Sequence, residues 1–586
     1  VKIKTFYIKP DLRIHAEEVQ INDKKQNPMI YLGKLDAKLS LRDLVEEMRV
    51  GSINVDDVLV YLVKYQDEYK VNISELFASD KEREKKEISN IYLDELNLTR
   101  GHFVFWNQNK DNPEKLGMDY AHLDIDSIYL SASKLSFNGD TIVGFMHDLR
   151  AEDKSGFVLR EFNSPSKFLV SSKGFDFKHL KIKTHATNLD LDLQFLYNDY
   201  SDYNKFVDSI YIIANIYPSQ LTLSDLKYFS TAMGKMPDTL QIEGLINGFV
   251  RDFVAKDFSF SFKDSTSFLG TIKMRGLPKF SDTHIVGDVK KMTFTYQDIS
   301  EFAIPSPTGK IPLPEMLASV KEAVFSGNYN GFPNKFNTKF NLLTNVGNIY
   351  FEGALNNDTN IVKKPAYFYA MHANNVNVKE ILGLKDELMV TFASEMSGEG
   401  LNRKNADFQM SLDVERMKYD SNEFDNIKLL CDMENQRIIA ETNINSELIK
   451  LNLNGLLDIS HQVPSFDVRM NVDNADLYRL GLFDMDEKMI LSTEIMANMR
   501  GDNIDRLYGN LNIDNTLYQD SRGSYTMDSL DIVITENHFD SKNISVNCDF
   551  FDLNIDGIFN FKNIGNTFKN YVRNHFHVKK WGDKGV

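Results

Sequence analysis

Alternation of apolar and polar residues is the feature that most constrains this chain. In Asn188–Phe195 every second residue is Leu or Phe, and the residues between them are Asn, Asp or Gln. Because successive side chains of a β-strand point to opposite faces, a period of two predicts a strand with one apolar face. The same alternation recurs in four other segments: Phe258–Phe262, Lys335–Leu342, Lys450–Leu453 and Val546–Ile555. We therefore predict an all-β chain in which strands run nearly end to end.

Short polar turns separate the alternating segments. Asn138-Gly139-Asp140 and Asn356-Asn357-Asp358 are examples. Such turns suit antiparallel connections and leave little room for the helices that connect parallel strands. The sequence therefore predicts an antiparallel sheet.

A few short segments have the pattern of capped helices. Each begins with a residue of the capping type and is long enough for one or two turns. They start at Ser224, Asp298, Asn377 and Asn474, which gives spacings of 74, 79 and 97 residues. We expect them at the ends of a repeated β unit, along a rim of the sheet. A further helix is predicted over Pro314–Val324, after a proline-rich stretch.

Two glycine patterns also recur. Gly244–Phe249 returns as Gly327–Phe332, with Asn-Gly-Phe at the end of both copies. The pattern Gly270-x-Ile272 returns as Gly347-x-Ile349, each followed by another glycine. Recurrence at a long period is typical of repeat proteins, in which each unit contacts its neighbours.

Composition excludes several classes of protein. The chain has 84 acidic and 67 basic residues, a net charge of −17, and no basic patch, so nucleic acid is not an expected partner. The two cysteines, Cys431 and Cys548, exclude a disulfide scaffold and a zinc ribbon, and they could pair or stay free. No apolar run approaches the roughly 20 residues that a membrane helix needs.

The search for chemistry finds no catalytic or phosphate-binding motif. His575 and His577 could share a strand face, but a surface tail explains them better than a metal site. Asp190 and Asp192 project in parallel from a strand and are interpreted as a solvent face, and the same holds for Asp124 and Asp126. We expect no enzyme activity, no metal and no cofactor.

The apolar face of the predicted sheet could be covered in two ways, by a second sheet of the protein or by lipid. A second sheet would make a dry sandwich, whereas a single sheet curled into an open trough would expose the face to acyl chains. The repeat favours the trough. The residues predicted to line it are Leu189, Leu191, Leu193, Phe195, Phe258, Phe260, Phe262, Phe336, Phe340, Leu342, Leu451 and Leu453. An arginine at Leu191 is expected to block lipid transfer without unfolding the chain.

Several segments of the sequence resemble a known family. They include Ile30–Ala37 followed by Leu39–Leu44, Val71-Asn72-Ile73 leading to Leu76-Phe77, Ser155-Gly156-Phe157, the paired Asn-Gly-Phe segments, and Leu507–Leu511 with Tyr518. In order and spacing they are similar to the TamB branch of the AsmA-like proteins, the inner-membrane component of the translocation and assembly module, in its bacteroidete-type version. The resemblance covers nearly the whole chain and corresponds to the N-terminal and middle portion of the family.

The resemblance implies an elongated, repetitive antiparallel sheet curled into an open hydrophobic groove. It implies five segments: an AsmA-like N-terminal β segment at 1–90, a β-groove segment at 91–220, a repeat with short helices at 221–325, further repeats at 326–480, and a last repeat with the tail of the fragment at 481–586. These boundaries are expectations.

The resemblance also implies a function and a location. Family members are anchored in the inner membrane, extend through the periplasm toward the outer membrane and carry phospholipid, in some cases with a TamA-type outer-membrane barrel partner. The chain starts without a methionine, and we expect the anchor upstream of it and the barrel contact in regions outside it.

Two other functions remain open from the sequence. A scaffold or chaperone for outer-membrane protein assembly would act through strand edges, by β-augmentation. A hydrolase or glycan-binding protein is the third reading, and the lack of a nucleophile, an acid/base pair or an aromatic platform argues against it.

Overall fold

The computed structural model describes residues 1–39, 48–68, 70–75, 90–110, 118–228, 236–303, 310–311, 313–358, 362–480, 489–536, 541–558 and 560. His575 and His577 lie outside these residues, as do most of the proline-rich stretch at 305–314 and part of the family-like phrases, at 40–44 and 76–77.

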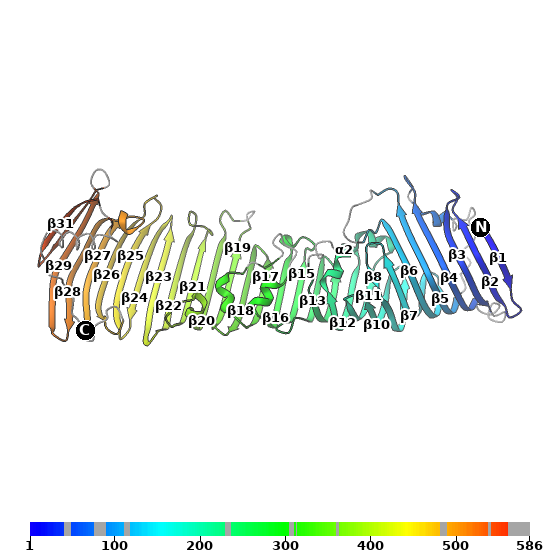
Figure 1. Ribbon diagram of the computed structural model, residues 1–586, viewed down its shortest axis with the longest axis horizontal. Coiled ribbons are helices and arrows are strands. Elements are labelled where there is room, and N and C mark those ends of the chain that lie inside the picture. The colour runs from blue at the N-terminus through cyan, green and yellow to red at the C-terminus, as the bar shows by residue number, and fades with distance from the viewer. Residues whose placement is uncertain are drawn as a thin grey trace, which may run out of the picture. The chain divides into compact units, whose positions relative to one another are not determined.

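The fold is all-β, as predicted, and the chain divides into two units, Val1–Pro333 and Asn334–Val586. In each unit, strands pair with their neighbours in the sequence to form one open sheet (Figure 1). The strands of unit 1 are β1 Lys2–Ile8, β2 Arg13–Asn22, β3 Pro28–Leu39, β4 Met48–Lys64, β5 Ile91–Asn107, β6 His122–Asn138, β7 Thr141–Asp153, β8 Val158–Leu159, β9 Glu161–Ser171, β10 Gly174–Lys183, β11 Asn188–Leu196, β12 Tyr211–Thr222, β13 Thr239–Phe249, β14 Asp252–Phe262, β15 Thr266–Arg275, β16 His284–Phe294 and β17 Ala323–Phe332.

Unit 2 continues the numbering. Its strands are β18 Lys335–Thr344, β19 Gly347–Asn356, β20 Ala366–Asn377, β21 Leu388–Glu399, β22 Asp407–Tyr419, β23 Asn422–Glu434, β24 Arg437–Asn445, β25 Ile449–Asp458, β26 Ser465–Asp476, β27 Ile490–Arg500, β28 Tyr508–Asp520, β29 Gly523–Glu536, β30 Lys542–Cys548 and β31 Asp552–Gly557. The short helices of the two units are η1 Asn72–Glu75, η2 Tyr200–Lys205, α2 Phe206–Ser209, η3 Leu223–Tyr228, η5 Phe280–Asp282, α3 Tyr296–Glu301, η6 Glu315–Ser319, α4 Val378–Leu382 and η7 Ile504–Arg506.

Pairing is antiparallel, as predicted, with an exception at β4 and β5. These two strands run parallel from Met48 opposite Ile91 to Lys64 opposite Asn107. Parallel neighbours need a long crossover, and the segment between the two strands supplies it. Asn72, in the crossover, is buried and fixes its start, because its side-chain oxygen accepts a hydrogen bond from the backbone N–H of Val63 at 3.1 Å.

Three of the four predicted capped helices are present. Ser224 lies in the 3₁₀-helix η3, Asp298 lies in α3, and Asn377 caps α4 by accepting a hydrogen bond from the backbone N–H of Glu380 at 3.0 Å. They occupy the β12–β13, β16–β17 and β20–β21 connections. A helix therefore recurs every four strands at these three connections, in agreement with the predicted repeat.

The other helix predictions are wrong. Asn474 lies in β26, because long-range pairing of Asp476 with Ile490 extends the strand past the helix-like sequence. The helix over Pro314–Val324 is reduced to η6, Glu315–Ser319, and its Met316 is 49% exposed.

One strand prediction is also wrong. Val546–Ile555 is a hairpin and not a single strand, since β30 ends at Cys548, β31 begins at Asp552, and Val546 pairs with Leu553. An apolar and polar alternation cannot show where a strand reverses when the turn itself contains large apolar residues.

The Asn-Gly-Phe recurrence has equivalent positions in the sheet. Gly244–Phe249 closes β13, and Gly327–Phe332 closes β17, four strands later. Gly244 has φ +136°, and a Cβ there would lie 2.7 Å from the Cα of Phe258. Only glycine fits this close approach. The second recurrence does not occupy equivalent positions, because Gly270 lies inside β15 and Gly347 begins β19.

Bulges bend the strands of unit 1. In β14, Asp257 has φ 46°, and the pairing with β15 shifts between Ala255 and Phe258. A bulge inserts an extra residue, bends its strand and increases the local twist. It also lets Ala255 and Phe258, three positions apart, point to the same face. Register shifts of this kind occur in every pairing between successive strands from β9 to β17.

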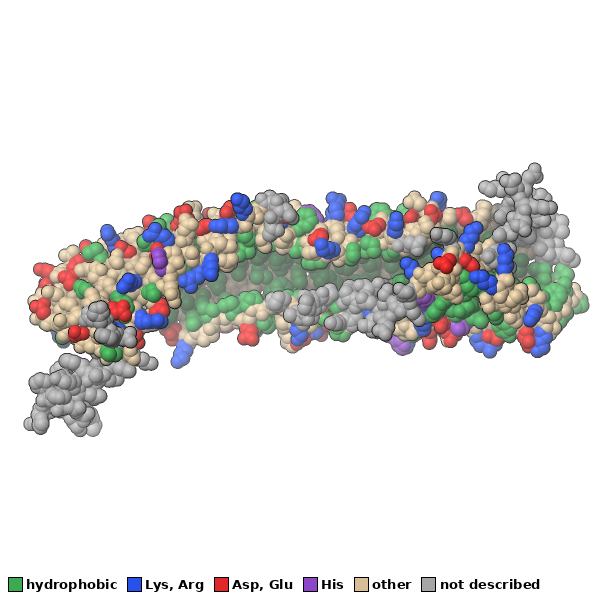
Figure 2. Space-filling model, turned by 90° about the horizontal axis from the view of Figure 1, so that it is seen from above, with side chains coloured by type: hydrophobic (Ala, Val, Ile, Leu, Met, Phe, Trp, Pro, Cys, Tyr) green, Lys and Arg blue, Asp and Glu red, His purple; other side chains and the backbone are tan. Residues whose placement is uncertain are grey.

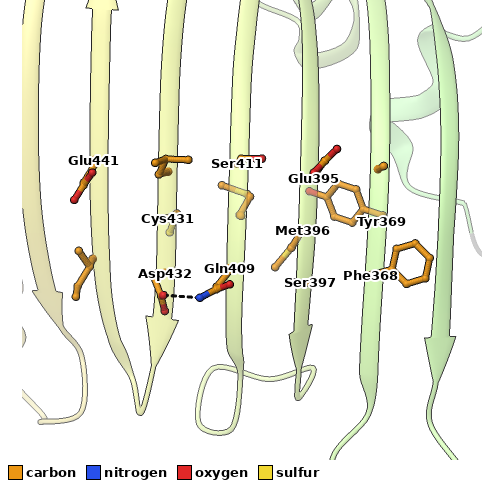
Figure 3. Close-up of a pocket in the computed structure, with 14 residues that line it drawn as sticks. Phe368, Tyr369, Glu395, Met396, Ser397, Gln409, Ser411, Cys431, Asp432 and Glu441 are labelled. Atoms are coloured by element: carbon orange, nitrogen blue, oxygen red, sulfur yellow. Dashed lines mark hydrogen bonds between the residues drawn. The ribbon is translucent and has the colours of Figure 1, made fainter.

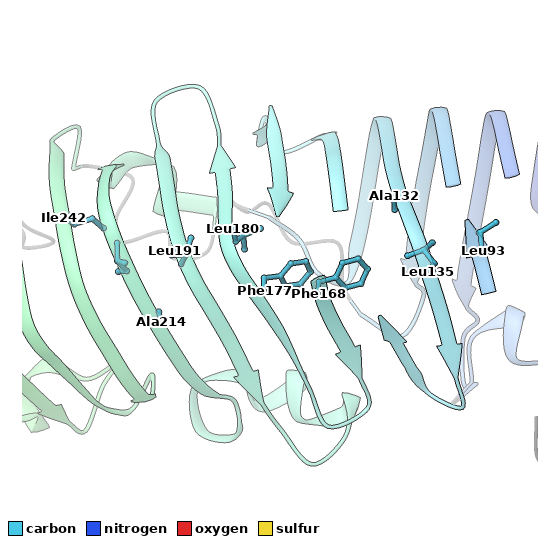
Figure 4. Close-up of a cluster of buried hydrophobic side chains, with 10 residues drawn as sticks. Leu93, Ala132, Leu135, Phe168, Phe177, Leu180, Leu191, Ala214 and Ile242 are labelled. Carbon is cyan, nitrogen blue, oxygen red and sulfur yellow. The ribbon is translucent and has the colours of Figure 1, made fainter. Parts of the chain in front are cut away.

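The main core of unit 1 lies on the apolar side of β5 to β13. Leu93, Leu135, Phe168, Phe177 and Leu180 are each at most 6% exposed and belong to one cluster (Figure 4). The ring of Phe177 stacks on Phe168 with centroids 5.2 Å apart. These rings pack closely where the strands bend. The resulting dispersion contacts and the burial of apolar surface stabilise the bent strands.

Candidate functional site: the apolar inner face

Strand β11 shows how the sequence sets two faces. Leu191 lies opposite Leu180 of β10 and Ile216 of β12, while Leu193 lies opposite Phe177 and Ala214. Directly opposed residues share a face of the sheet. We call the face that carries these residues the inner face. Figure 2 shows apolar side chains inside a hollow whose rims carry charged side chains.

The aspartates of β11 lie on the opposite, outer face. Asp192 accepts hydrogen bonds from the backbone N–H of His179 at 2.9 Å and from the Tyr217 hydroxyl at 3.1 Å. Asp190 lies opposite Lys181. Asp124, on β6, contacts His102 at 2.7 Å. These carboxylates therefore belong to the polar outer face, as the alternation predicts.

All twelve residues predicted to line the groove fall on inner positions. Phe258, Phe260 and Phe262 of β14 face the same side as the β11 leucines, and Phe260 stacks on Phe268 at 5.2 Å. In unit 2, Phe340 stacks on Phe351 at 5.0 Å, with Phe336 and Leu342 on the same side of β18. Leu451 and Leu453 lie opposite Val472 and Met470 of β26. Whether lipid touches these residues stays a prediction.

The twelve positions differ in burial, and this changes one expectation. Leu191 and Phe262 are 6% and 4% exposed and belong to the packed interior, whereas Leu193, Phe195 and Phe340 are half-buried. An arginine at Leu191 would place a charge inside the main core, which costs several kcal/mol. Given this burial, we expect the substitution at Leu191 to destabilise unit 1, so a half-buried position is the better test site.

The inner positions of β10 to β25 carry no Asp, Glu, Lys or Arg among the residues that the structure describes. Some of the polar side chains there hydrogen-bond within the sheet. Ser394, for example, donates to the backbone carbonyl of Ser411 at 3.0 Å. Charged residues gather outside, in exposed pairs such as Lys290 with Asp257 at 2.7 Å. Over β10 to β25, the described charged side chains thus lie on the outer face of the strands, and the inner positions are mostly apolar.

Sequence reasoning missed the methionines of unit 2. Met396, Met410 and Cys431 follow one another across β21, β22 and β23 on the inner face, and Met371 and Met470 lie on the same face. Phe408, Met410, Leu412 and Val414 have the same alternation that predicted the other strands, so this signal was available. Methionine is flexible and polarisable, which suits a surface that adapts to its contacts.

The two cysteines are free and lie far apart in the sequence, on β23 and β30. Burial, with a smaller contribution from the neighbouring Asp432 carboxylate, raises the pKa of the Cys431 thiol. A thiol with a raised pKa is a poor nucleophile at neutral pH. Cys431 therefore acts as an apolar wall residue.

The outer face of unit 2 carries an open depression of about 700 Å³ over β20 to β24 (Figure 3). Gln409 donates to the Asp432 carboxylate at 3.1 Å within it. Phe368, Leu430 and Ile439 also line it and are 47%, 55% and 53% exposed. These side chains make the depression partly apolar.

No group of three or more His, Cys, Asp or Glu side chains within the described residues could hold a metal ion. None of the helices in the described part is long and apolar enough to cross a membrane.

Comparisons with known proteins add no relative. No protein-family model, no curated protein and no solved structure matches this chain.

Proposed function

We propose that the protein shields the hydrocarbon chains of phospholipids on its inner face and conducts them between two membranes. The inner face is free of charge over its described positions from β10 to β25, and it carries half-buried Leu, Phe and Met side chains that can exchange water for acyl chains. Each methylene that leaves water contributes about 0.8 kcal/mol, so a chain laid along several strands is held firmly.

The openness of the sheet supports this proposal over a dry sandwich. Each unit is one sheet built by neighbour pairing, and in the described residues no second sheet covers its inner face. A face of this kind exposes more apolar surface than a soluble monomer usually tolerates. The resemblance of the sequence to the TamB branch of the AsmA-like proteins points the same way. It supplies the rest of the proposal, which is a periplasmic location, an inner-membrane anchor and a TamA-like barrel partner. We propose that regions outside this chain provide the anchor and the contact with the barrel.

A matched pair of variants on one strand tests the proposal. Phe340 faces inward on β18, whereas Leu343 on the same strand faces outward and is 51% exposed. Protein purified from membranes is extracted, and the phospholipid per chain is counted by mass spectrometry. We expect phospholipid in the wild type, less in Phe340→Glu, and an unchanged amount in Leu343→Glu. Lipid-free wild-type protein, or equal loss in both variants, would refute the conduit.

A second candidate, a scaffold for outer-membrane protein assembly, is favoured by the outer depression at Phe368, Leu430 and Ile439. A photoreactive residue in place of Leu430 tests it in cells. Two results together would favour the scaffold over the conduit. The first is crosslinks to unfolded outer-membrane proteins, and the second is a Leu430→Asp strain that loses surface proteins but keeps a normal lipid count. The absence of crosslinks would reject it.

A further inference from the structure

A segment of unit 1 crosses the rim of the sheet and holds several hairpin ends together. We call this segment, Leu223–Tyr228 with its helix η3, the strap. It starts at the end of β12 and reaches back along the rim. The Thr184 hydroxyl, in the β10–β11 turn, donates to Asp225 at 2.5 Å. The Tyr228 hydroxyl donates to the carbonyl of Gly156, in the β7–β8 turn, at 2.9 Å.

The end of the strap also reaches the β5–β6 connection. The backbone N–H of Met118 donates to the carbonyl of Tyr228 at 2.9 Å. The ring of Phe157 packs edge-on against the Tyr228 ring, with centroids 5.3 Å apart. Tyr228 therefore ties Met118 and Phe157 to the rim, although neither is its neighbour in the sequence.

Met118 and Phe157 line an apolar chamber of about 390 Å³. Its other walls come from inner positions of four successive strands, including Phe103, Ile125, Leu149 and Leu159. Among the described residues of the lining, Asp153 alone is charged. One oxygen of its buried carboxylate accepts a hydrogen bond from the backbone N–H of Ser155 at 2.9 Å, and the other has no hydrogen-bond partner within the described part of the chain. Apart from this carboxylate, the described walls offer a ligand apolar side chains.

The chamber is continuous with the inner face. Phe103 lies opposite Val60 of β4 and Ile125 of β6, which belong to the inner face of unit 1. Its volume lies in the range of small-molecule sites, roughly 300 to 1,000 Å³. Apolar cavities do not retain water and bind apolar molecules instead. A chain end that reaches the chamber from the inner face therefore meets an apolar pocket in which two wall residues, Met118 and Phe157, are held in place by Tyr228.

We propose that this chamber is a docking site for one hydrocarbon chain of a lipid, and that the strap retains the chain. The inference deepens the proposed conduit and rests on it. A chain lying in the open part of the inner face exchanges freely, whereas a chain whose end lies under Met118 and Phe157 leaves only when the strap contacts loosen. The chamber therefore holds a slowly exchanging lipid within a fast conduit.

The probe for the test is cis-parinaric acid, a polyene fatty acid whose fluorescence rises in apolar surroundings, added to full-length, delipidated protein. We expect about one high-affinity binding site for the probe per chain, which we call the tight class, and weaker binding elsewhere. Ala151→Phe fills the chamber and should abolish the tight class, and Leu159→Phe gives a second filling variant if the first is poorly folded by circular dichroism. Ala440→Phe, an inner position of β24 in unit 2, is the control and should keep the tight class.

A second variant tests the strap. Tyr228→Phe keeps the ring contact and removes the hydrogen bond to Gly156, so the tight class should dissociate about fivefold faster, the effect of one ordinary hydrogen bond. Wild-type binding in both filling variants, or unchanged dissociation in Tyr228→Phe, would overturn the proposal.

Displacement identifies the source of the chain. Displacement of the probe by phosphatidylglycerol vesicles supports a phospholipid chain, and displacement by oleate alone supports a free fatty acid. Failure of both overturns the site. If the native protein contains phospholipid but shows no tight class, the chamber inference fails and the conduit stands. If it contains none and binds no probe, the conduit fails as well.

Discussion

Units 1 and 2 use the same antiparallel ladder but differ in how often it is interrupted. Every pairing between successive strands from β9 to β17 contains a register shift, whereas the pairings β18–β19, β19–β20, β22–β23, β23–β24 and β24–β25 contain none. Because each bulge bends its strand and increases the local twist, we expect the first set of strands to curve more strongly over its own inner face. The number of bulges would then set how much of an apolar face is left for a ligand.

The interiors of the two units differ accordingly. The main cluster of unit 1 gathers Phe168, Phe177 and Leu180 with many half-buried neighbours, and the cluster of unit 2 centres on Val472 and Met489 with fewer. Unit 1 combines stacked aromatic rings with the apolar chamber at Tyr228. Unit 2 presents inner walls that carry several methionines, among them Met371, Met396 and Met410. We infer that unit 1 retains lipid and unit 2 lets it move.

The largest effect is expected from removing a ring in each unit. Phe177→Ala should destabilise unit 1 by about 3–5 kcal/mol, the usual cost of a cavity at a buried phenylalanine. Phe340→Ala, at a half-buried position of unit 2, should cost about 1–2 kcal/mol, because less apolar area is lost. Hydrogen exchange on peptides from each unit of the full chain measures both. Equal costs would mean that the two interiors are packed alike.

A glycine pair gives the next effect. A Cβ at Gly244 would lie 2.7 Å from the Cα of Phe258 at φ +136°, whereas one at Gly455 has its nearest contact at 3.7 Å, to Leu453. Gly244→Ala should cost about 1–3 kcal/mol. Gly455→Ala should be neutral or stabilising by up to about 1 kcal/mol, since it restricts the unfolded chain. Chemical denaturation of the two variants compares them, and destabilisation by Gly455→Ala would show that unit 2 is as tightly curled as unit 1.

Much of this contrast could not be predicted from the sequence. The alternation in Asn188–Phe195 predicts a strand and its two faces because that signal is local. A bulge such as that at Asp257 needs one residue in the left-handed region, and aspartates are common at ordinary positions of these strands as well. The parallel pairing of β4 with β5 could not be predicted either, because alternation along a segment indicates a strand but not which strand it pairs with or in which direction.

The site was predicted unevenly for the same reason. Leu193 and Phe340 could be placed on the inner face from alternation alone. The burial of Leu191 depends on neighbours in β10 and β12, and the chamber depends on Tyr228 returning to the β7–β8 turn. Both are contacts between distant segments. The helix predicted at Asn474 failed in the same way, because pairing with β27 outweighed a local capping pattern.

Thiol reactivity compares the two faces within unit 2. Cys431 faces inward with a pKa raised chiefly by burial, whereas Leu430 is 55% exposed on the outer face. In a background with Cys548→Ala, Cys431 should react with a maleimide several-fold more slowly than a cysteine at position 430, tested as Leu430→Cys with Cys431→Ala. Phospholipid should slow the first reaction further and leave the second unchanged. Equal protection of both positions would contradict the assignment of faces.

The smallest effect concerns pH and one end of unit 1. Hydrogen bonds to Asp36 and then Glu17, at 2.7 and 3.1 Å, raise the pKa of His15 on β2 above its usual 6.5. A raised pKa stabilises the folded state below pH 6.5, and this contribution is lost as the pH rises through the folded value. Exchange protection of β1–β3, corrected for intrinsic rates, should therefore fall between pH 5.5 and 8.

Two controls accompany the pH measurement. His15→Gln should remove the pH dependence in β1–β3, and amides of β23–β25, strands without histidine, should show none in either protein. A pH response that survives His15→Gln would assign it to other groups.

Pairing between sequence neighbours also determines how such a chain can fold. Most new hairpins close a short loop on a strand that is already in place, so the entropy of loop closure stays small and contacts remain local. A chain that leaves a ribosome or a translocation channel N-terminus first can therefore lengthen its ladder strand by strand, using the last exposed edge as the template for the next. The step from β4 to β5 is the exception, because the crossover must be complete before the parallel pair can form. Folding of unit 1 should pause there until the crossover has been synthesised, which would couple synthesis to assembly at this step.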